Sequence, residues 1–471
     1  MNVVITGATG LIGRALARSL LGAGHGVVAW TRNPESARRR LPALCEARRW
    51  DAERVEPADL DGVDVVVHLA GENVASGRWT AARRAAIEQS RVASTRAIVD
   101  AIAKRSVSDR PRAFVCASAI GIYGDRGDEI LEEDDSPGEG FLAGVCKAWE
   151  REALAAAGLG VRAVAVRVGV VLAPEEGALG RLLPIFRLGL GGPVASGKQW
   201  MSWIHLDDVV ALFRHAVESE GVRGPMNAVA PAPVRNHEFT RVLAQSLGRP
   251  ALLPVPAFGL KLAFGEMASV LLASQRVRPR VAEETGFRHR YATLAEALAP
   301  ICASPDHESV YEQVVPVPIE EAFAFFADAK NLERITPDFL HFSITGMSTE
   351  KIELGTTIDY RLRLHGMPVR WRSRIEEWAP PHRFVDVQLS GPYAVWHHTH
   401  ELEEVDGGTL VRDRVRYRLP LGALGDLAAG SFVARDLERI FEHRYETLAR
   451  LLHPRSGAAP ASRPGPASIA D

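Results

Sequence analysis

At 471 residues the chain is longer than a single hydrophobic core usually supports, so two or three domains are expected. Its charged fraction of 24% is ordinary and its formal net charge at pH 7 is −2, which argues against nucleic acid or an anionic membrane surface as the main partner. Four widely spaced cysteines without a CxxC pair, and the lack of an apolar run of about 18 residues, predict a cytoplasmic protein with neither a disulfide framework nor a stable membrane anchor.

The chain opens with a strand, a glycine turn and a helix. A short buried strand predicted at residues 1–5 leads into the sequence TGATGLIG at residues 6–13, and a helical pattern follows. Gly7 permits a tight turn, Gly10 lets backbone approach a pyrophosphate, and Gly13 lets the helix pack closely on the strand. The free N–H groups at the start of such a helix attract phosphate. We therefore predict a dinucleotide site with contacts from Gly7, Thr9, Gly10, Leu11, Ile12 and Gly13.

The next predicted strand, residues 26–30, ends without an acidic residue. An enzyme that uses NAD needs a carboxylate at this position to hold the ribose 2′-hydroxyl. Arg32 stands there instead, and its forked donors suit a 2′-phosphate, so we expect NADP(H). Arg38 and Arg39 either help Arg32 to hold the 2′-phosphate or form a solvated helix face. Asp51, after the third predicted strand, is a weaker candidate for contact with the adenine.

The rest of the first half alternates between strands and helices. The predicted elements are strands at 63–69, 113–118 and 161–168 and helices at 80–104 and 142–157. This alternation is typical of an α/β fold in which helices cover both faces of a doubly wound parallel sheet.

Several sequence blocks resemble the extended short-chain dehydrogenase/reductases. The blocks are TGATGLIG at 6–13, HLAG at 68–71, SAIGIYG at 118–124 and WIHLDDV at 203–209. GKQWMSW at 197–203 and SQRVRP at 274–279 narrow the resemblance to the epimerase-like branch of nucleotide-sugar-epimerase homologues, which ends in its own short C-terminal domain. The resemblance implies a Rossmann domain over residues 1–303, with that short subdomain at about 250–300, bound NADP(H), and reductase or epimerase chemistry. It also implies cofactor contacts from Leu69, Ala70 and Gly71.

The catalytic pair of that superfamily, Tyr-x-x-x-Lys on one helix, is incomplete here. The lysine lowers the tyrosine pKa and holds the nicotinamide ribose, so that the phenol can transfer a proton. Lys147 matches the lysine, but Ala143 stands at the tyrosine position. Ser118 matches the catalytic serine, one residue off the usual distance from Tyr123. Tyr123 is the best substitute acid, and a structural tyrosine is the equal alternative.

Cys146 and Glu150 are further candidate substitutes, and both have simpler interpretations. We expect Cys146 to be a small packing residue, because buried cysteines usually are. Glu150 lies three residues beyond Lys147, so the two side chains can pair on one helix face. His205, in the late block, is expected to be a structural hydrogen-bonding histidine.

Near residue 306 the alternation of strands and helices ends and a run of strands begins. A strand at 310–316 and a helix at 319–326 precede a run of strands, and an amphipathic helix closes the segment. This order predicts an α+β domain over residues 306–454, in which a curved antiparallel sheet surrounds a long C-terminal helix and leaves a concave apolar pocket. Residues 455–471 are rich in alanine, proline and serine and predict a disordered tail.

The second domain resembles the helix-grip superfamily of polyketide cyclases and START-type lipid-transfer proteins. The sequence VPVPIEEAF at 315–323 carries the resemblance most specifically, and it implies an apolar or aromatic ligand in the cavity. WHHTH at 396–400 places His398 and His400 on one face of a strand. No third ligand is evident from the sequence, so we expect no metal site there.

The two halves together predict an NADP(H)-dependent oxidoreductase or a sugar-nucleotide-epimerase-like enzyme fused to a hydrophobic-ligand module. Lys147 would contact the nicotinamide ribose. Because Ala143 stands at the position of the catalytic tyrosine, the alternative function is that of a non-catalytic NADP(H)-binding ligand carrier or sensor. The sequence predicts neither the substrate nor the oligomeric state.

Overall fold

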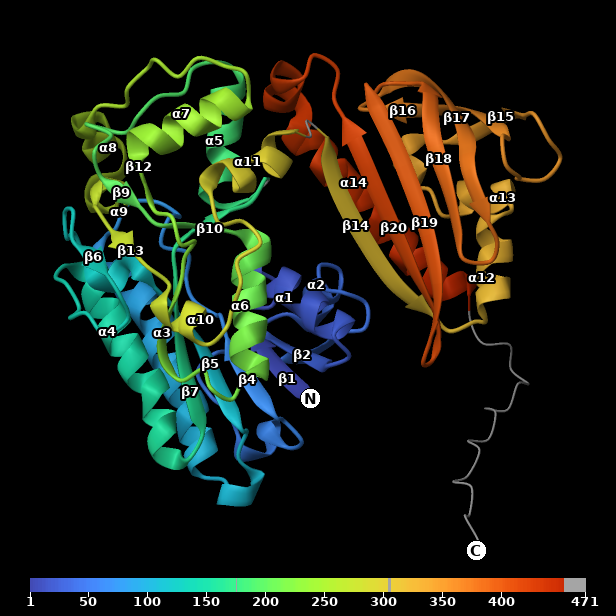
Figure 1. Cartoon of the computed structure of the whole chain (residues 1–471). Helices are drawn as coiled ribbons and strands as arrows, with labels where there is room; N and C mark the ends of the chain where they lie inside the picture. Colours follow the sequence, from blue (N-terminus) through green and yellow to red (C-terminus); the bar gives the residue numbers. More distant parts are fainter. Residues whose placement is uncertain (175, 304–305, 453–471) are drawn as a thin grey trace, which may run out of the picture. The chain divides into compact units, whose positions relative to one another are not determined.

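The structure is a computed structural model that describes residues 1–174, 176–303 and 306–452 (Figure 1). It forms two compact units. The N-terminal unit comprises Met1–His307 and Leu421–Ala429, and the C-terminal unit comprises Glu308–Pro420 and the chain from Gly430 onward. No helix of the described residues is long and apolar enough to cross a membrane.

The sequence placed the domain boundary at residues 303–306, and residues 304–305 lie outside the described part. The structure assigns the short segment Leu421–Ala429 to the N-terminal unit. Asp426 explains this assignment, because its carboxylate lies 2.9 Å from Nε2 of His307 and 3.5 Å from Nη1 of Arg187. The tail predicted at 455–471 also falls outside the described residues.

A seven-stranded parallel sheet forms the centre of the N-terminal unit, in the order β11-β7-β5-β4-β1-β2-β3. Its strands are β1 (Asn2–Thr6), β2 (Gly26–Thr31), β3 (Glu46–Arg49), β4 (Val65–His68), β5 (Ala113–Ala119), β7 (Arg162–Val168) and β11 (Gly224–Ala228). The strand order reverses between β1 and β4, which confirms the doubly wound fold. Ligands of such sheets bind at this reversal, beyond the carboxyl ends of the strands.

Helices cover both faces of this sheet because successive strand residues point to opposite sides. Val3 and Ile5 belong to one core with α1 (Leu11–Gly22) and α6 (Leu206–Glu218), whereas Val4 belongs to the other core with α3 (Ala81–Ala103) and α4 (Phe141–Leu154). The remaining regular elements are α2 (Pro34–Arg38), β6 (Ile130–Leu131), β8 (Val170–Leu172), α5 (Gly177–Arg187), β9 (Trp200–Met201), β10 (Trp203–His205), β12 (Val234–Arg235), α7 (Asn236–Ser246), α8 (Ala257–Phe264), α9 (Ala268–Leu272), β13 (Arg276–Val277), α10 (Arg280–Glu284) and α11 (Leu294–Ala303).

The C-terminal unit is a seven-stranded sheet packed around a long helix, as the helix-grip resemblance implied (Figure 1). Its strands are β14 (His307–Val315), β15 (Ser343–Met347), β16 (Thr357–Leu364), β17 (Met367–Ala379), β18 (Arg383–Ser390), β19 (Val395–Val405) and β20 (Gly408–Arg418). Its helices are α12 (Ile319–Phe326), α13 (Ala329–Arg334) and, from Gly430 onward, α14 (Ala423–Leu451). Leu448 of α14 joins Val315 and Phe384 of the sheet in one apolar core. The predicted α+β architecture is therefore confirmed.

Candidate functional site

The glycine turn after β1 meets the end of β4 at the point where the strand order reverses. Gly7 has a φ of +68°, and a Cβ there would lie 2.8 Å from the backbone nitrogen of Ala70. At Gly13 a Cβ would lie 2.4 Å from the carbonyl oxygen of Gly7, so the start of α1 packs directly on the turn. Gly10 is the N-cap of α1, and no side chain caps the helix. The first N–H groups of α1 are thus available to an anion at this crevice.

A buried network joins the two turns. The Thr6 hydroxyl oxygen accepts the backbone N–H groups of Leu69 (3.1 Å) and Ala70 (3.2 Å) and lies 2.7 Å from Nδ1 of His68. Nε2 of His68 lies 3.0 Å from the hydroxyl oxygen of Ser94. Burial, with a smaller contribution from a nearby arginine, lowers the pKa of His68 to about 3. A neutral His68 therefore holds the ends of β1 and β4 together.

This network makes the N-terminal unit sensitive to acid. An unfolded histidine takes up a proton near pH 6.5 and folded His68 does not, so the unfolded state binds more protons as the pH falls and stability declines below that pH. We expect wild type to lose about 2 kcal/mol more stability than His68→Gln between pH 7 and pH 5. Urea unfolding of both proteins at the two pH values measures the difference. Equal losses would show that His68 is not buried as a neutral ring.

The predicted contacts to the adenosine part lie after β2 and β3. Arg32 follows β2, is exposed, and pairs with no carboxylate among the described residues. Asp51 follows β3, and its Oδ1 accepts the backbone N–H groups of Glu53 (3.0 Å) and Arg54 (3.2 Å). Asp51 therefore builds the turn after β3, while Arg32 remains available to a phosphate. Both assignments remain predictions.

The candidate proton donors lie in a second buried network. Glu150 accepts a hydrogen bond from the Ser118 hydroxyl (2.6 Å), and both its oxygens bind the Arg167 guanidinium (2.9 and 2.8 Å). Arg167 also donates to the Tyr123 hydroxyl oxygen (2.8 Å). The Tyr123 hydroxyl lies 2.8 Å from Oδ1 of Asn227. Although burial disfavours its charge, the pairing with Glu150 raises the pKa of Arg167.

This network bears on three expectations from the sequence and corrects one of them, the partner of Glu150. Tyr123 is 0% exposed and burial raises its pKa to about 12, so the structure favours the structural role over that of a substitute acid. The Ser118 hydroxyl is likewise committed to Glu150. Glu150 pairs with Arg167, not with Lys147, because Lys147 is on the exposed side of α4 and Glu150 is on its buried side.

Cys146 and His205 occupy structural positions. Burial raises the pKa of the Cys146 thiol to about 11, as expected of a packing residue. His205 is the N-cap of α6 and accepts the backbone N–H of Asp207 (3.1 Å). Sequence reasoning missed Arg167. A second arginine near the end of the apolar strand RAVAVRV was the available signal, because a buried charge needs a partner.

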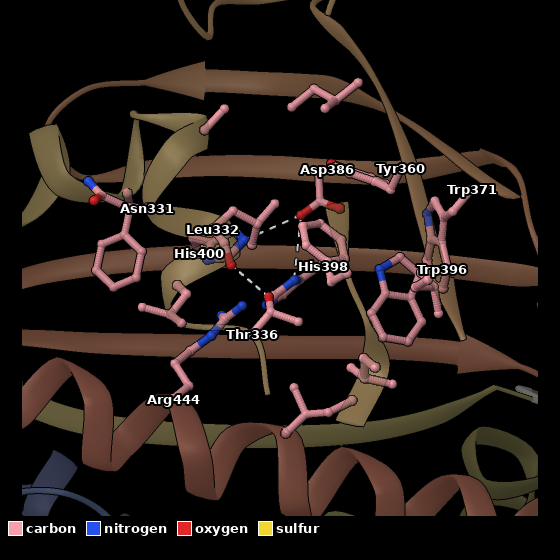
Figure 2. Close-up of a pocket in the computed structure, with 18 of the residues that line it drawn as sticks. Asn331, Leu332, Thr336, Tyr360, Trp371, Asp386, Trp396, His398, His400 and Arg444 are labelled. Carbon is pink, nitrogen blue, oxygen red and sulfur yellow. Dashed lines mark hydrogen bonds and ion pairs between the residues drawn. The ribbon is translucent and has the colours of Figure 1, made fainter. Parts of the chain in front are cut away.

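The C-terminal unit encloses a cavity of about 180 Å³ between its sheet and α14 (Figure 2). Its walls are mainly aromatic and aliphatic, and Trp371 and Trp396 meet edge to face in one of them with ring centroids 5.0 Å apart. An apolar cavity of about 150 Å³ is sufficient to hold a benzene ring, so this cavity has room for an aromatic ligand.

A polar cluster lies at the floor of this cavity. Asp386 of β18 pairs in register with His398 of β19, and His400 of β19 pairs with Asp413 of β20, so the four side chains share the inner face of the sheet. Nη1 of Arg444, from α14, lies 3.1 Å from Oδ1 of Asp413. Burial opposes the charge on Asp413, but Arg444 and His400 outweigh it and hold the pKa of Asp413 well below its usual range.

The expectation of no metal site rested on the lack of a third ligand beside His398 and His400. The structure provides that third group, because Asp386 lies close enough to both histidines for the three to bind one metal ion. Sequence reasoning missed it because strand register, not sequence distance, brings β18 beside β19. An aspartate in the otherwise apolar segment FVDV was the available signal.

A parallel sheet with a glycine turn at its switch point defines a Rossmann-like dinucleotide-binding domain. Residues 3–228 match the model of the NAD dependent epimerase/dehydratase family, residues 255–301 match a domain of unknown function (DUF1731), and residues 306–453 match the model named "Polyketide cyclase / dehydrase and lipid transport". The chain is 40% identical to the epimerase family protein Mb2239 of Mycobacterium bovis over 299 residues, 63% of this chain and 96% of that one. It therefore belongs to the epimerase family and carries a polyketide cyclase-like domain in addition.

Solved structures support the same assignment. The human epimerase family protein SDR39U1, crystallised with NADPH, is 34% identical with a TM-score of 0.58, and the match covers 64% of this chain and all (100%) of that one. A nucleoside-diphosphate sugar epimerase from Corynebacterium glutamicum is also 34% identical, with a TM-score of 0.53 over 64% of this chain and 58% of that one.

Proposed function

We propose that the N-terminal unit binds NADP(H) at the crevice where β1 and β4 end. The observation that carries this proposal is the backbone-to-backbone contact between the Gly7 turn and Ala70, beside the uncapped start of α1. A Cβ at Gly7 or Gly13 would collide with neighbouring backbone, so only glycine lets the turn and the start of α1 pack this closely, as a pyrophosphate site of this kind requires. The human relative crystallised with NADPH supports the same cofactor.

Each part of the cofactor has its own proposed contacts. The pyrophosphate would lie on residues 7–13 and the turn at Leu69, Ala70 and Gly71, and Arg32 would hold the 2′-phosphate. Lys147 is the proposed contact to the nicotinamide ribose. NADP(H), when bound, supplies a hydride donor or acceptor, and the protein fixes its orientation.

We propose that the unit uses this cofactor as an oxidoreductase or an epimerase-like enzyme. Ala143 removes the usual phenol, and the hydroxyl of Tyr123 already has protein partners. Proton transfer would therefore depend on water or on a group of the substrate. The same observations favour a second candidate, an NADP(H)-binding carrier or sensor without turnover. In both cases the C-terminal cavity would hold an apolar or aromatic ligand.

Loss of the guanidinium at Arg32 should weaken NADPH binding selectively. A charge-assisted hydrogen bond to the 2′-phosphate is lost in Arg32→Ala, so we expect NADPH affinity to fall roughly tenfold or more while NADH affinity stays nearly unchanged. Fluorescence titrations of both cofactors on both proteins measure this. Arg151→Ala, which removes an exposed arginine of α4, is the control. An equal loss for NADPH and NADH would place the 2′-phosphate elsewhere.

The two candidate functions are separated by turnover. The full chain is mixed with NADPH or NADP⁺ and a panel of carbonyl compounds and sugar nucleotides. The NADPH absorbance is followed, and the sugar nucleotides are analysed for a changed configuration, because an epimerase returns the hydride and leaves no net change in the cofactor. Oxidation of NADPH, or conversion of a sugar nucleotide, that requires both the protein and a panel member supports the enzyme. Tight NADPH binding with neither change across the panel supports the carrier or sensor.

A further inference from the structure

We propose that Asp386, His398 and His400 bind a divalent transition-metal ion at the floor of the C-terminal cavity (Figure 2). The three residues come from adjacent strands and project from the inner face of the sheet. Two imidazoles and one carboxylate are a ligand set that both zinc and non-haem iron use in proteins.

The distances between the three groups suit one shared ion. Oδ2 of Asp386 lies 3.3 Å from Nε2 of His400 and 3.5 Å from Nδ1 of His398. Metal–ligand bonds of about 2.0–2.1 Å in a tetrahedral arrangement separate neighbouring ligand atoms by about 3.3 Å. The side chains therefore need little movement to take up a metal.

The far nitrogens of both imidazoles face a second carboxylate. Oδ1 of Asp413 lies 3.0 Å from Nε2 of His398 and 2.7 Å from Nδ1 of His400, although the angle at His400 is poor for a hydrogen bond. Metal-binding histidines characteristically direct their other ring N–H to such a carboxylate, which fixes the tautomer and the ring orientation. With its Nε2 proton directed at Asp413, His398 presents the lone pair of Nδ1 toward Asp386. Nε2 of His400 lies within hydrogen-bond distance of the same Asp386 oxygen.

Without a metal, Asp386 shares a hydrogen bond with His400 while Nδ1 of His398 faces the same carboxylate oxygen. One shared proton would satisfy Asp386 and a single imidazole, and it would leave the lone pair of the other imidazole directed at a carboxylate. A divalent ion satisfies all three. Arg444 neutralises Asp413, so Asp386 supplies the negative charge nearest the ion.

The ion would keep an open position toward the cavity, since only three protein groups hold it. The aromatic wall that contains Trp371 and Trp396 lies in the same cavity. The ligand class that fits both features is an aromatic or apolar molecule with an oxygen donor, such as an enolate, a phenolate or a carbonyl. This inference goes beyond NADP(H) binding and does not depend on it.

Metal binding is tested with the metal alone. The full chain is stripped with a chelator, without added cofactor or ligand, and titrated with Co²⁺ and then Zn²⁺. We expect about one ion per chain and a visible Co²⁺ absorption band of a low-coordinate site, which Zn²⁺ removes. Asp386→Asn, which keeps the side-chain shape, should weaken binding by at least roughly tenfold, and Asp413→Asn should weaken it by roughly 10–100-fold.

His397→Gln is the matched control, because His397 lies on the same strand but on its opposite face, and it should bind as wild type does. Should Asp386→Asn fail to fold, as circular dichroism would show, His398→Gln replaces it. Absence of the Co²⁺ band in wild type, or equal binding by wild type and the ligand variants, would overturn the proposal in favour of a cluster that shares only a proton.

Discussion

Gly13→Ala should weaken NADPH binding by at least roughly a hundredfold, because the site depends on close packing of backbone against backbone. The added Cβ would lie 2.4 Å from the carbonyl oxygen of Gly7 and 2.7 Å from Cα of Ala8, and neither is the end of a flexible side chain. The start of α1 would have to move away from the turn, and its N–H groups would lose their alignment with the pyrophosphate.

A matched control is available in the same helix. Gly22, the last residue of α1, has open space where a Cβ would be, so Gly22→Ala should leave NADPH affinity unchanged. Thermal unfolding of both variants would show whether Gly13→Ala still folds. A Gly13→Ala protein that is folded and binds NADPH as tightly as wild type would contradict the proposed cradle.

Arg167→Leu should destabilise the N-terminal unit by about 3–5 kcal/mol, the usual result of removing one partner from a buried ion pair. The Glu150 carboxylate would keep only the Ser118 hydroxyl, and the Tyr123 hydroxyl would lose a donor. Urea unfolding of wild type and variant measures the loss.

Two further variants sharpen this test. Arg151→Leu removes an exposed arginine from the same helix as Glu150 and should change stability by less than about 0.5 kcal/mol. Replacing Arg167 and Glu150 together by leucine should cost less than Arg167→Leu alone, because no uncompensated charge remains buried. A loss below about 1 kcal/mol for Arg167→Leu would mean that Glu150 finds another partner.

The fold could be predicted because its signals are local. The glycine turn at residues 6–13 and the change of pattern near residue 306 identified both architectures without knowledge of any long-range contact. The assignment of Leu421–Ala429 was not predictable in this way, since it depends on where Asp426 meets Arg187 and His307.

The functional sites were only partly predictable, because some of their residues meet through long-range contacts. The phosphate cradle is contiguous in sequence, so its glycines could be read directly. Helical spacing suggested Lys147 as the partner of Glu150, and this prediction was wrong. The fold brings Arg167 from the neighbouring sheet to Glu150 instead. Asp386 was missed because the pairing of β18 with β19 sets its distance from His398.

The most direct test of the account is a titration of the wild-type full chain with NADPH and, separately, with NADH. The glycine cradle binds the pyrophosphate that both cofactors share, and Arg32 meets the 2′-phosphate that only NADPH carries. We therefore expect both to bind and NADPH to bind roughly tenfold or more tightly. Identical binding curves for the two cofactors, or no binding of either, would contradict the proposal that this unit is an NADP(H) site.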